Sequence, residues 1–186
     1  MKKKIIFIMN PISGTASKAG IPNLIDSTLD KELFEYEIKL TERAGHASEL
    51  ATEAKNNHAD IVVAVGGDGT VNEVARSLVH SDTALGILPC GSGNGLARHL
   101  LLPMNLRKSI EVINACKIND LDYGVINGHP FFCTCGMGFD AFVSMKFAES
   151  GKRGPISYAE NILREGLKYE PETYTLEDET GTKQYK

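Results

Sequence analysis

The sequence has 186 residues, enough for one hydrophobic core and the beginning of a second. Hydrophobic residues make up 42% and charged residues 24%, which is typical of a folded globular protein and excludes a disordered chain. The formal net charge of −4 argues against nucleic acid as the main partner, and no segment reaches transmembrane length. The four cysteines lack paired zinc-binding spacing, and residues 1–9 do not form an export signal. We therefore expect reduced thiols and a cytoplasmic protein.

Strand and helix patterns alternate through the first hundred residues. The predicted strands cover residues 4–9, 36–41, 61–65 and 85–88, and the first two predicted helices cover residues 22–29 and 46–55. A helix is also expected after each of the last two strands. This alternation predicts an α/β fold with a parallel sheet, whose loops at the carboxyl ends of the strands bind a ligand.

The segment Val65-Gly66-Gly67-Asp68-Gly69-Thr70-Val71-Asn72-Glu73 joins the third strand to a helix. Glycines let a ligand approach the backbone, and the amides of a helix N-terminus favour an anion, so the segment predicts a phosphate site. Thr70 and Glu73 have the spacing of a capping box at the start of that helix. Asp68 is the one acid among the glycines, and a carboxylate beside phosphate needs a cation between them. The alternative is a glycine-rich turn in which Asp68 is a local turn acid.

The alternation of strand and helix patterns ends near residue 118. We place a domain boundary there, which gives domains 1–118 and 119–186. The pair Asn127-Gly128 between apolar runs predicts a β-hairpin, with residues 131–135 as the return strand. Cys133 and Cys135 are then expected in the core of the protein. Further along the chain we predict a helix ending near Ala148, a helix over 155–167 and a strand over 173–176.

The sequence can be searched for two common nucleotide-binding motifs. No GxxxxGK[ST] sequence occurs, so the chain has no P-loop. Gly136-x-Gly138-x-x-Ala141 matches a relaxed dinucleotide fingerprint, but it follows an antiparallel hairpin and lacks the acidic residue that completes the motif. An oxidoreductase is therefore disfavoured.

Four motifs follow one another along the chain: Asn10-Pro-x-Ser13-Gly14, Thr41 with Gly45-His46-Ala47, residues 66–73, and Gly91-Ser92-Gly93-Asn94. In this order they resemble the diacylglycerol kinase catalytic domain, which sphingosine kinases and bacterial lipid kinases share. Asp122-Tyr123-Gly124 and Gly138-Phe139-Asp140-Ala141 resemble the start of that family's second domain. The resemblance covers the whole chain. It implies a parallel-sheet nucleotide-binding domain followed by the start of a β-rich domain, as in NAD kinases and diacylglycerol kinases.

The resemblance implies an ATP-dependent lipid kinase that transfers the γ-phosphate to a hydroxyl of diacylglycerol or a related lipid. Its cofactors would be ATP and Mg2+, and its partner a lipid at the membrane surface, so peripheral membrane association is expected and a homodimer stays open. Asp68 is the predicted metal ligand, and Asp68 and Asp122 are the predicted catalytic residues. The predicted nucleotide-binding residues are Asn10, Pro11, Ile12, Ser13, Gly14, Thr41, Gly66, Gly67, Asp68, Gly69, Thr70, Val71, Asn72 and Ser92.

The chain departs from the family pattern at Gly95, where many bacterial diacylglycerol kinases carry an acid. Its fourth motif is closer to that of sphingosine kinases. The resemblance also places an acidic catalytic residue and the lipid pocket in a C-terminal part that this chain does not contain, so we expect nucleotide binding without transfer. Three alternatives stay open: a sphingosine or long-chain base kinase, a kinase of a soluble acceptor similar to NAD kinases, and a nucleotide-binding module without catalysis.

Overall fold

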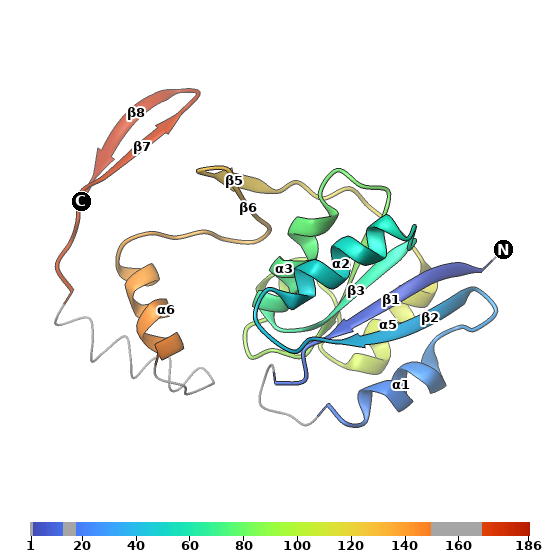
Figure 1. Ribbon diagram of the computed structural model, residues 1–186. Coiled ribbons are helices and arrows are strands. Elements are labelled where there is room, and N and C mark those ends of the chain that lie inside the picture. The colour runs from blue at the N-terminus through green and yellow to red at the C-terminus, as the bar shows by residue number, and fades with distance from the viewer. Residues whose placement is uncertain (1, 13–17, 150–168) are drawn as a thin grey trace. The chain divides into compact units, whose positions relative to one another are not determined.

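The computed structural model describes residues 2–12, 18–149 and 169–186 (Figure 1). It forms two compact units, Met1–Thr134 and Cys135–Lys186, which we describe separately. The domain boundary near residue 118 stays a prediction about domain organisation.

A four-stranded parallel sheet forms the centre of the first unit. The strands are β1 (Lys3–Met9), β2 (Phe34–Leu40), β3 (Ile61–Gly66) and β4 (Ala84–Pro89), in the spatial order β2-β1-β3-β4. Strand β3 is buried along its whole length because it lies between β1 and β4 and is covered on both faces. The predicted α/β fold with a parallel sheet is confirmed.

Helices cover both faces of this sheet, and Figure 1 shows α1 and α5 on one side and α2 and α3 on the other. The helices are α1 (Ile21–Thr28), α2 (His46–Asn56), α3 (Asp68–Leu78), the short α4 (Gly95–His99) and α5 (Leu106–Ala115). Successive strand residues point to opposite faces, so each strand contributes to two cores. In β1, Ile6 and Ile8 pack with α2, α3 and α4, whereas Ile5 and Phe7 pack with α1 and α5.

A β-hairpin follows at the predicted place, with β5 (Gly124–Ile126) paired antiparallel to β6 (His129–Phe131). Asn127 and Gly128 have φ values of +49° and +78°, as a two-residue hairpin turn requires. The prediction for the return strand is wrong in extent, because the strand ends at Phe131. Cys133 and Cys135 are exposed and do not belong to the core.

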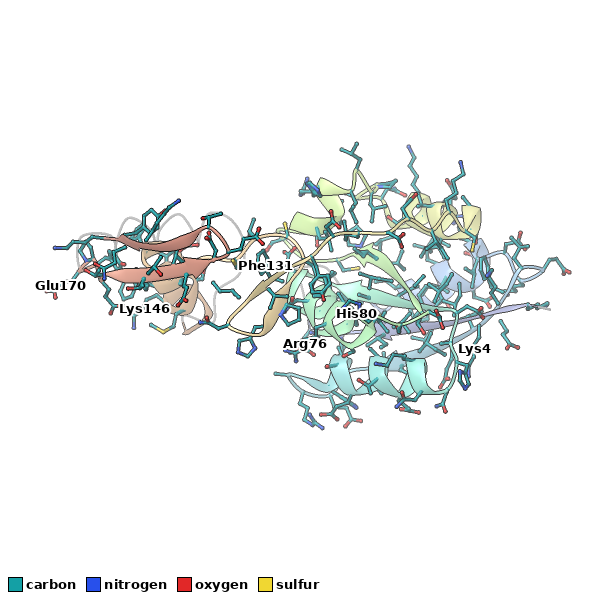
Figure 2. The ribbon with its side chains drawn as sticks, turned by 90° about the horizontal axis from the view of Figure 1, so that it is seen from above. Lys4, Arg76, His80, Phe131, Lys146 and Glu170 are labelled. Atoms are coloured by element: carbon teal, nitrogen blue, oxygen red, sulfur yellow. The ribbon has the colours of Figure 1, made fainter. Side chains whose placement is uncertain are left out.

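The hairpin is fastened to the end of α3 through ring contacts. The hydroxyl of Tyr123 lies 3.0 Å from Nε2 of His80, two residues beyond α3, and the Tyr123 ring stacks on Phe132. Phe132 in turn packs against the core cluster that contains α3. Figure 2 shows His80 beside the hairpin that carries Phe131. These contacts place residues 123–132 in the first unit.

The second unit contains α6 (Phe139–Glu149) and a hairpin of β7 (Tyr174–Asp178) and β8 (Gly181–Tyr185). Helix α6 confirms the helix predicted to end near Ala148, and β7 agrees with the strand predicted over 173–176. Strand β8 was not predicted, since all five of its residues are exposed and it has no apolar alternation. The helix predicted over 155–167 lies outside the described residues.

Candidate functional site

Four loops begin side by side at the carboxyl edge of the sheet. Parallel pairing continues one residue beyond the strands, where Asn10 N–H donates to Val65 O, Thr41 N–H to Met9 O and Cys90 N–H to Gly66 O. The loops after β1, β2, β3 and β4 therefore leave the sheet at neighbouring points. This is the edge at which open parallel sheets bind ligands.

Asp68 joins the loop after β3 to the loop after β4. Its Oδ2 accepts a hydrogen bond from Asn94 N–H at 2.9 Å, and its Oδ1 accepts one from Gly95 N–H at 2.6 Å. The carboxylate remains exposed on its other side. Because the acceptor of both hydrogen bonds is a charged carboxylate, they are stronger than hydrogen bonds between neutral groups.

The same two loops approach so closely that there is no space for side chains between them. A Cβ atom on Gly91 would lie 2.5 Å from the Cα of Gly67, and one on Gly93 would lie 2.7 Å from Oδ2 of Asp68. Asn94 closes the second loop on itself, because its side chain accepts from Gly91 N–H and donates to Gly91 O, both at 2.8 Å. The result is a fixed surface of backbone atoms at the ends of β3 and β4.

Helix α3 begins at this surface, but not through the predicted capping box. The helix starts at Asp68 with Gly67 as its N-cap and has no side-chain capping bond, so the expected Thr70–Glu73 cap is wrong. The first internal bond runs from Val71 N–H to Gly67 O. The N–H groups of residues 68–70 have no acceptor within the helix, as at every helix start. They form the positive end of the helix dipole, which favours an anion.

Glu73 connects α3 to the loop after β2 instead. Its two carboxylate oxygens accept from Gly45 N–H at 3.1 Å and from Ala47 N–H at 3.2 Å, at the start of α2. A negative charge at a helix N-terminus is favourable, and Gly45 takes a positive φ of +81° there. Glu73 therefore fixes a third loop of the site, which its sequence position did not reveal.

Lys18 is a buried cation beside the first loop. The residue is 7% exposed, and its Nζ donates to Asn10 O at 2.6 Å. Burial lowers the pKa of the Lys18 amine, and burial raises the pKa of the nearby Cys90 thiol at the end of β4. Oδ1 of Asn10 accepts from Ile12 N–H at 3.0 Å, which holds the start of the loop. No sequence pattern distinguished Lys18 from a surface lysine.

The predicted nucleotide-binding residues gather at this edge. Asn10, Pro11 and Ile12 follow β1, Thr41 follows β2, residues 66–72 end β3 and open α3, and exposed Ser92 follows β4. The Thr41 side chain is buried, and Ser13 and Gly14 lie outside the described residues.

Asp122 is not brought to Asp68. It lies next to Tyr123, which contacts His80 beyond the last turn of α3, whereas Asp68 opens that helix. Eleven helical residues at 1.5 Å each separate those two ends by about 15 Å. The proposed catalytic role of Asp122 stays a prediction that this arrangement does not support.

Cys133 lies where sequence reasoning placed a core residue, yet its thiol is next to the candidate site. A Cβ atom on Gly95 would lie 3.3 Å from Sγ of Cys133 and 3.5 Å from Oδ1 of Asp68. The absence of a side chain at residue 95 thus leaves room for both groups. The sequence predicted a buried cysteine because residues 131–135 resemble a strand, whereas the strand ends before Cys133.

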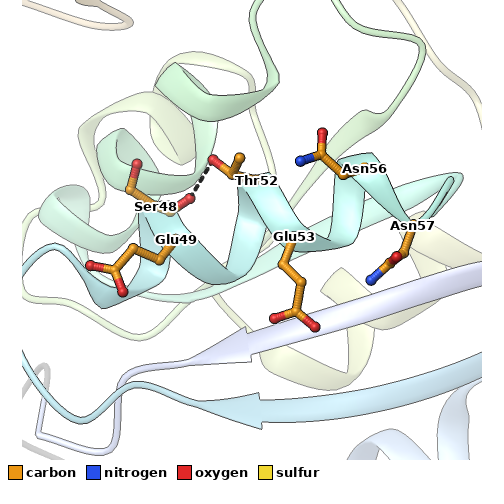
Figure 3. A pocket seen from close by; sticks show the side chains of 6 residues that line it. All are labelled: Ser48, Glu49, Thr52, Glu53, Asn56 and Asn57. Atoms are coloured by element: carbon orange, nitrogen blue, oxygen red, sulfur yellow. Dashed lines mark hydrogen bonds between the residues drawn. The ribbon is translucent and has the colours of Figure 1, made fainter.

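Within the described ranges, no group of three or more histidine, cysteine or acidic side chains is arranged to hold a metal ion. A shallow depression on the outer side of α2 is lined by Ser48, Glu49, Thr52, Glu53, Asn56 and Asn57 (Figure 3). Its lining comes from one helix, and its two acids pair with Arg43 and Lys39. All six lining side chains are polar, and none of them is among the predicted nucleotide-binding residues.

The comparisons with known proteins decide the family. The sequence model of the diacylglycerol kinase catalytic domain matches residues 4–126. The chain belongs to the diacylglycerol kinase catalytic-domain family. The match contains the sheet apart from Lys3, the loops after its four strands, and β5.

Two curated relatives and one solved structure agree with this assignment. A protein of Streptococcus pneumoniae serotype 4, whose name gives lipid kinase as a provisional activity, is 32% identical over 184 residues, covering 96% of this chain and 62% of its own. A diacylglycerol kinase of Staphylococcus saprophyticus is 32% identical over 163 residues, covering 85% of this chain and 53% of its own. A crystal structure of a diacylglycerol kinase from Bacillus anthracis aligns with a TM-score of 0.59 at 26% identity, over 69% of this chain and 48% of that one. The chain thus spans about half to three-fifths of the length of these relatives.

Proposed function

We propose that this chain forms the nucleotide-binding part of a lipid kinase that uses ATP and Mg2+ to phosphorylate the hydroxyl of diacylglycerol or a related lipid. Membership of the family supports a phosphotransferase. The nucleotide, the metal, the acceptor and the residue roles below are our proposal.

The observation that carries the proposal is the Asp68 contact between two glycine-rich loops. It fixes residues 66–70 against residues 91–95 with no side chain between Gly67 and Gly91. Backbone N–H groups at a helix start can then bind phosphate oxygens without paying to order the loops on binding. Asn10, Pro11 and Ile12 of the first loop would flank the nucleotide, and Ser92 would contact it from the loop after β4.

The residues present also fit Mg2+. This ion usually binds one or two carboxylates together with phosphate oxygens and water, and a dedicated cluster of acids is not needed. Asp68 is exposed beside the helix start, and each of its oxygens keeps a lone pair beyond the one that accepts an N–H. Bound Mg2+ would neutralise charge on the transferred phosphate. Asp68 would position that ion, and Lys18 would add positive charge behind the first loop.

The named activities of the relatives are the support for a lipid acceptor. Curated relatives named diacylglycerol kinase favour diacylglycerol as the acceptor. Gly95 and the fourth motif, which is closer to that of sphingosine kinases, favour a long-chain base as the alternative acceptor. In the part of the chain that the structure describes, no helix has the length and apolar character to cross a membrane. Membership of the family is the reason to place the lipid acceptor at a membrane surface.

Two measurements test the proposal. Calorimetry with this chain should detect ATP binding that Mg2+ strengthens, and GTP or ADP titrations define the base and phosphate contributions. A phosphate-transfer panel with labelled ATP should then compare diacylglycerol, sphingosine and NAD, using a longer relative of this family as the positive control. Absence of ATP binding by the folded chain would refute the nucleotide site, and transfer to NAD without transfer to either lipid would refute the lipid acceptor.

A further inference from the structure

The turn after α4 has a leucine at a position where helices usually have a glycine. Leu102 N–H donates to Ala97 O and Leu101 N–H donates to Arg98 O, both near 3 Å, which is the paired bonding of a Schellman helix end. Leu101 occupies the residue of that motif that needs a left-handed backbone, and its φ is +56°. Glycine is the usual residue there because it has no Cβ to strain.

Leu101 is also 89% exposed, and the adjacent Leu100 is 39% exposed. Leu102 turns inward and packs against the core, so the chain could bury a leucine here and presents two others to solvent. The other non-glycine residues with positive φ in the described ranges are His58, His80, Asn94, Cys116 and Asn127. Histidine and asparagine tolerate this backbone region, whereas leucine gains nothing from it. A strained and exposed apolar residue indicates a function outside the folded core.

The stretch of sequence that contains this turn is basic. Residues 83–110 contain no aspartate or glutamate, although the whole chain has 24 such acids. The same stretch carries Arg98, Arg107 and Lys108, all exposed, and His99. Exposed apolar side chains in a stretch of sequence that carries cations and no acids match the surface of a membrane that contains anionic lipids.

The turn is coupled to the candidate site through α4. The first residue of this helix, Gly95, donates to Asp68, and Nε of Arg98 donates to Gly93 O at 2.8 Å. The five residues of α4 span about 8 Å, so the leucine turn lies within one short helix of the loop that we assign to nucleotide binding.

We infer that Leu100 and Leu101 insert into the surface of an anionic membrane, with Arg98, Arg107 and Lys108 contacting lipid head groups. Membrane insertion would bring the candidate site to a lipid acceptor, and this purpose rests on the proposed function. The binding itself needs neither ATP nor transfer.

The test is co-sedimentation of the chain with phosphatidylglycerol–phosphatidylcholine vesicles and with pure phosphatidylcholine vesicles, without nucleotide. We expect binding to the anionic vesicles that weakens with salt. Leu101→Gly should lower the partition coefficient about tenfold or more, since it removes the most exposed apolar side chain. Its thermal midpoint should stay the same or rise, because glycine accepts the positive φ without strain. Loss of vesicle binding therefore cannot be attributed to unfolding.

Two further variants complete the design. Leu33→Ser removes another exposed leucine, 48% accessible and located before β2, and should leave vesicle binding unchanged. The double variant Arg107→Gln with Lys108→Gln should weaken binding about tenfold or more at low salt and little at high salt.

Three outcomes would overturn the inference: no binding to anionic vesicles, equal binding by Leu101→Gly, or equal loss in Leu33→Ser. A fourth is self-association in the absence of lipid that Leu101→Gly abolishes, which would make a second copy of the chain the occupant. ATP binding by Leu101→Gly without vesicles is expected to be normal, so failure here and failure of the nucleotide site give different results.

Discussion

Gly95 donates its backbone N–H to Oδ1 of Asp68 at 2.6 Å, across 27 residues of sequence. The bond places an exposed carboxylate at the start of α3 against the start of α4, so one acid both shapes the site and remains available to a cation. The loop geometry and the proposed metal contact therefore depend on the same side chain. Mutations at Asp68 should affect nucleotide binding with and without metal.

Asp68→Asn is expected to weaken ATP binding even in the presence of EDTA. The amide keeps one acceptor oxygen but turns an NH2 group toward a backbone N–H, so one loop bond is lost, with an effect of about 1–3 kcal/mol on the loop. The additional affinity that Mg2+ gives the unsubstituted chain should disappear. Calorimetry with EDTA and with Mg2+ measures both effects. Equal ATP affinity of the two proteins under both conditions would show that Asp68 acts neither on the loops nor on the metal.

Glu73→Ala should destabilise the fold more than the loss of a helix cap would. Two backbone N–H groups at the start of α2 lose a charged acceptor, so we expect a loss of about 2 kcal/mol. For a chain of this length that corresponds to a fall of roughly 4–8 °C in Tm. Thermal unfolding followed by circular dichroism measures it, and Glu73→Gln should recover part of the loss.

The matched control is Glu53→Ala on α2. Glu53 pairs with Lys39 at 2.8 Å, but its side chain is 53% exposed, so its removal should cost less than about 1 kcal/mol. Similar Tm changes in Glu73→Ala and Glu53→Ala would show that the Glu73 contacts contribute no more than a surface ion pair.

The sheet and its loops could be predicted because their signals are local. An apolar run such as residues 61–65 and a glycine-rich turn at its end are visible within ten residues, and parallel topology then brings the loops together. The partners of Asp68 and Glu73 could not be predicted in this way, since they lie 26 to 28 residues away. Glu73 also matched a local capping pattern, and the long-range contact replaced the local one. Strand β8 had no apolar residue pattern at all, because pairing with β7 alone leaves it exposed.

Lys18→Met should weaken ATP binding by about tenfold, as expected when a positive charge near phosphate is lost. The fold should be unaffected or more stable, since methionine removes a buried charge and keeps much of the side-chain volume. The pKa of Lys18 in the folded chain is below its ordinary value of 10.5, so the unfolded chain binds the proton more tightly. The cost of burying the charge is therefore present at pH 7 and decreases as the pH rises toward 10.5.

The measurement is a comparison of Tm for Lys18→Met and the unsubstituted chain at pH 7 and at pH 10. We expect the stability advantage of the methionine variant to shrink at the higher pH. Lys18→Arg, which keeps a charge, should retain more ATP affinity than Lys18→Met. Normal ATP affinity in Lys18→Met would exclude Lys18 from the nucleotide site, whatever the effect on stability.

Bound ATP should protect Cys133 from a thiol reagent, because its Sγ lies next to Gly95 in the loop that Asp68 holds. Cys135 is also exposed and would react too, so the experiment uses Cys135→Ser. In that variant Cys133 should be the fast-reacting thiol, since Cys90 and Cys116 are partly buried and burial raises the pKa of the Cys90 thiol. Absorbance with a disulfide reagent gives the rate, which ATP with Mg2+ should slow several-fold, and Cys133→Ser in the same background should remove the fast phase. A labelling rate that saturating ATP leaves unchanged would place the nucleotide away from Gly95 and contradict the assignment of the loop after β4 to its binding.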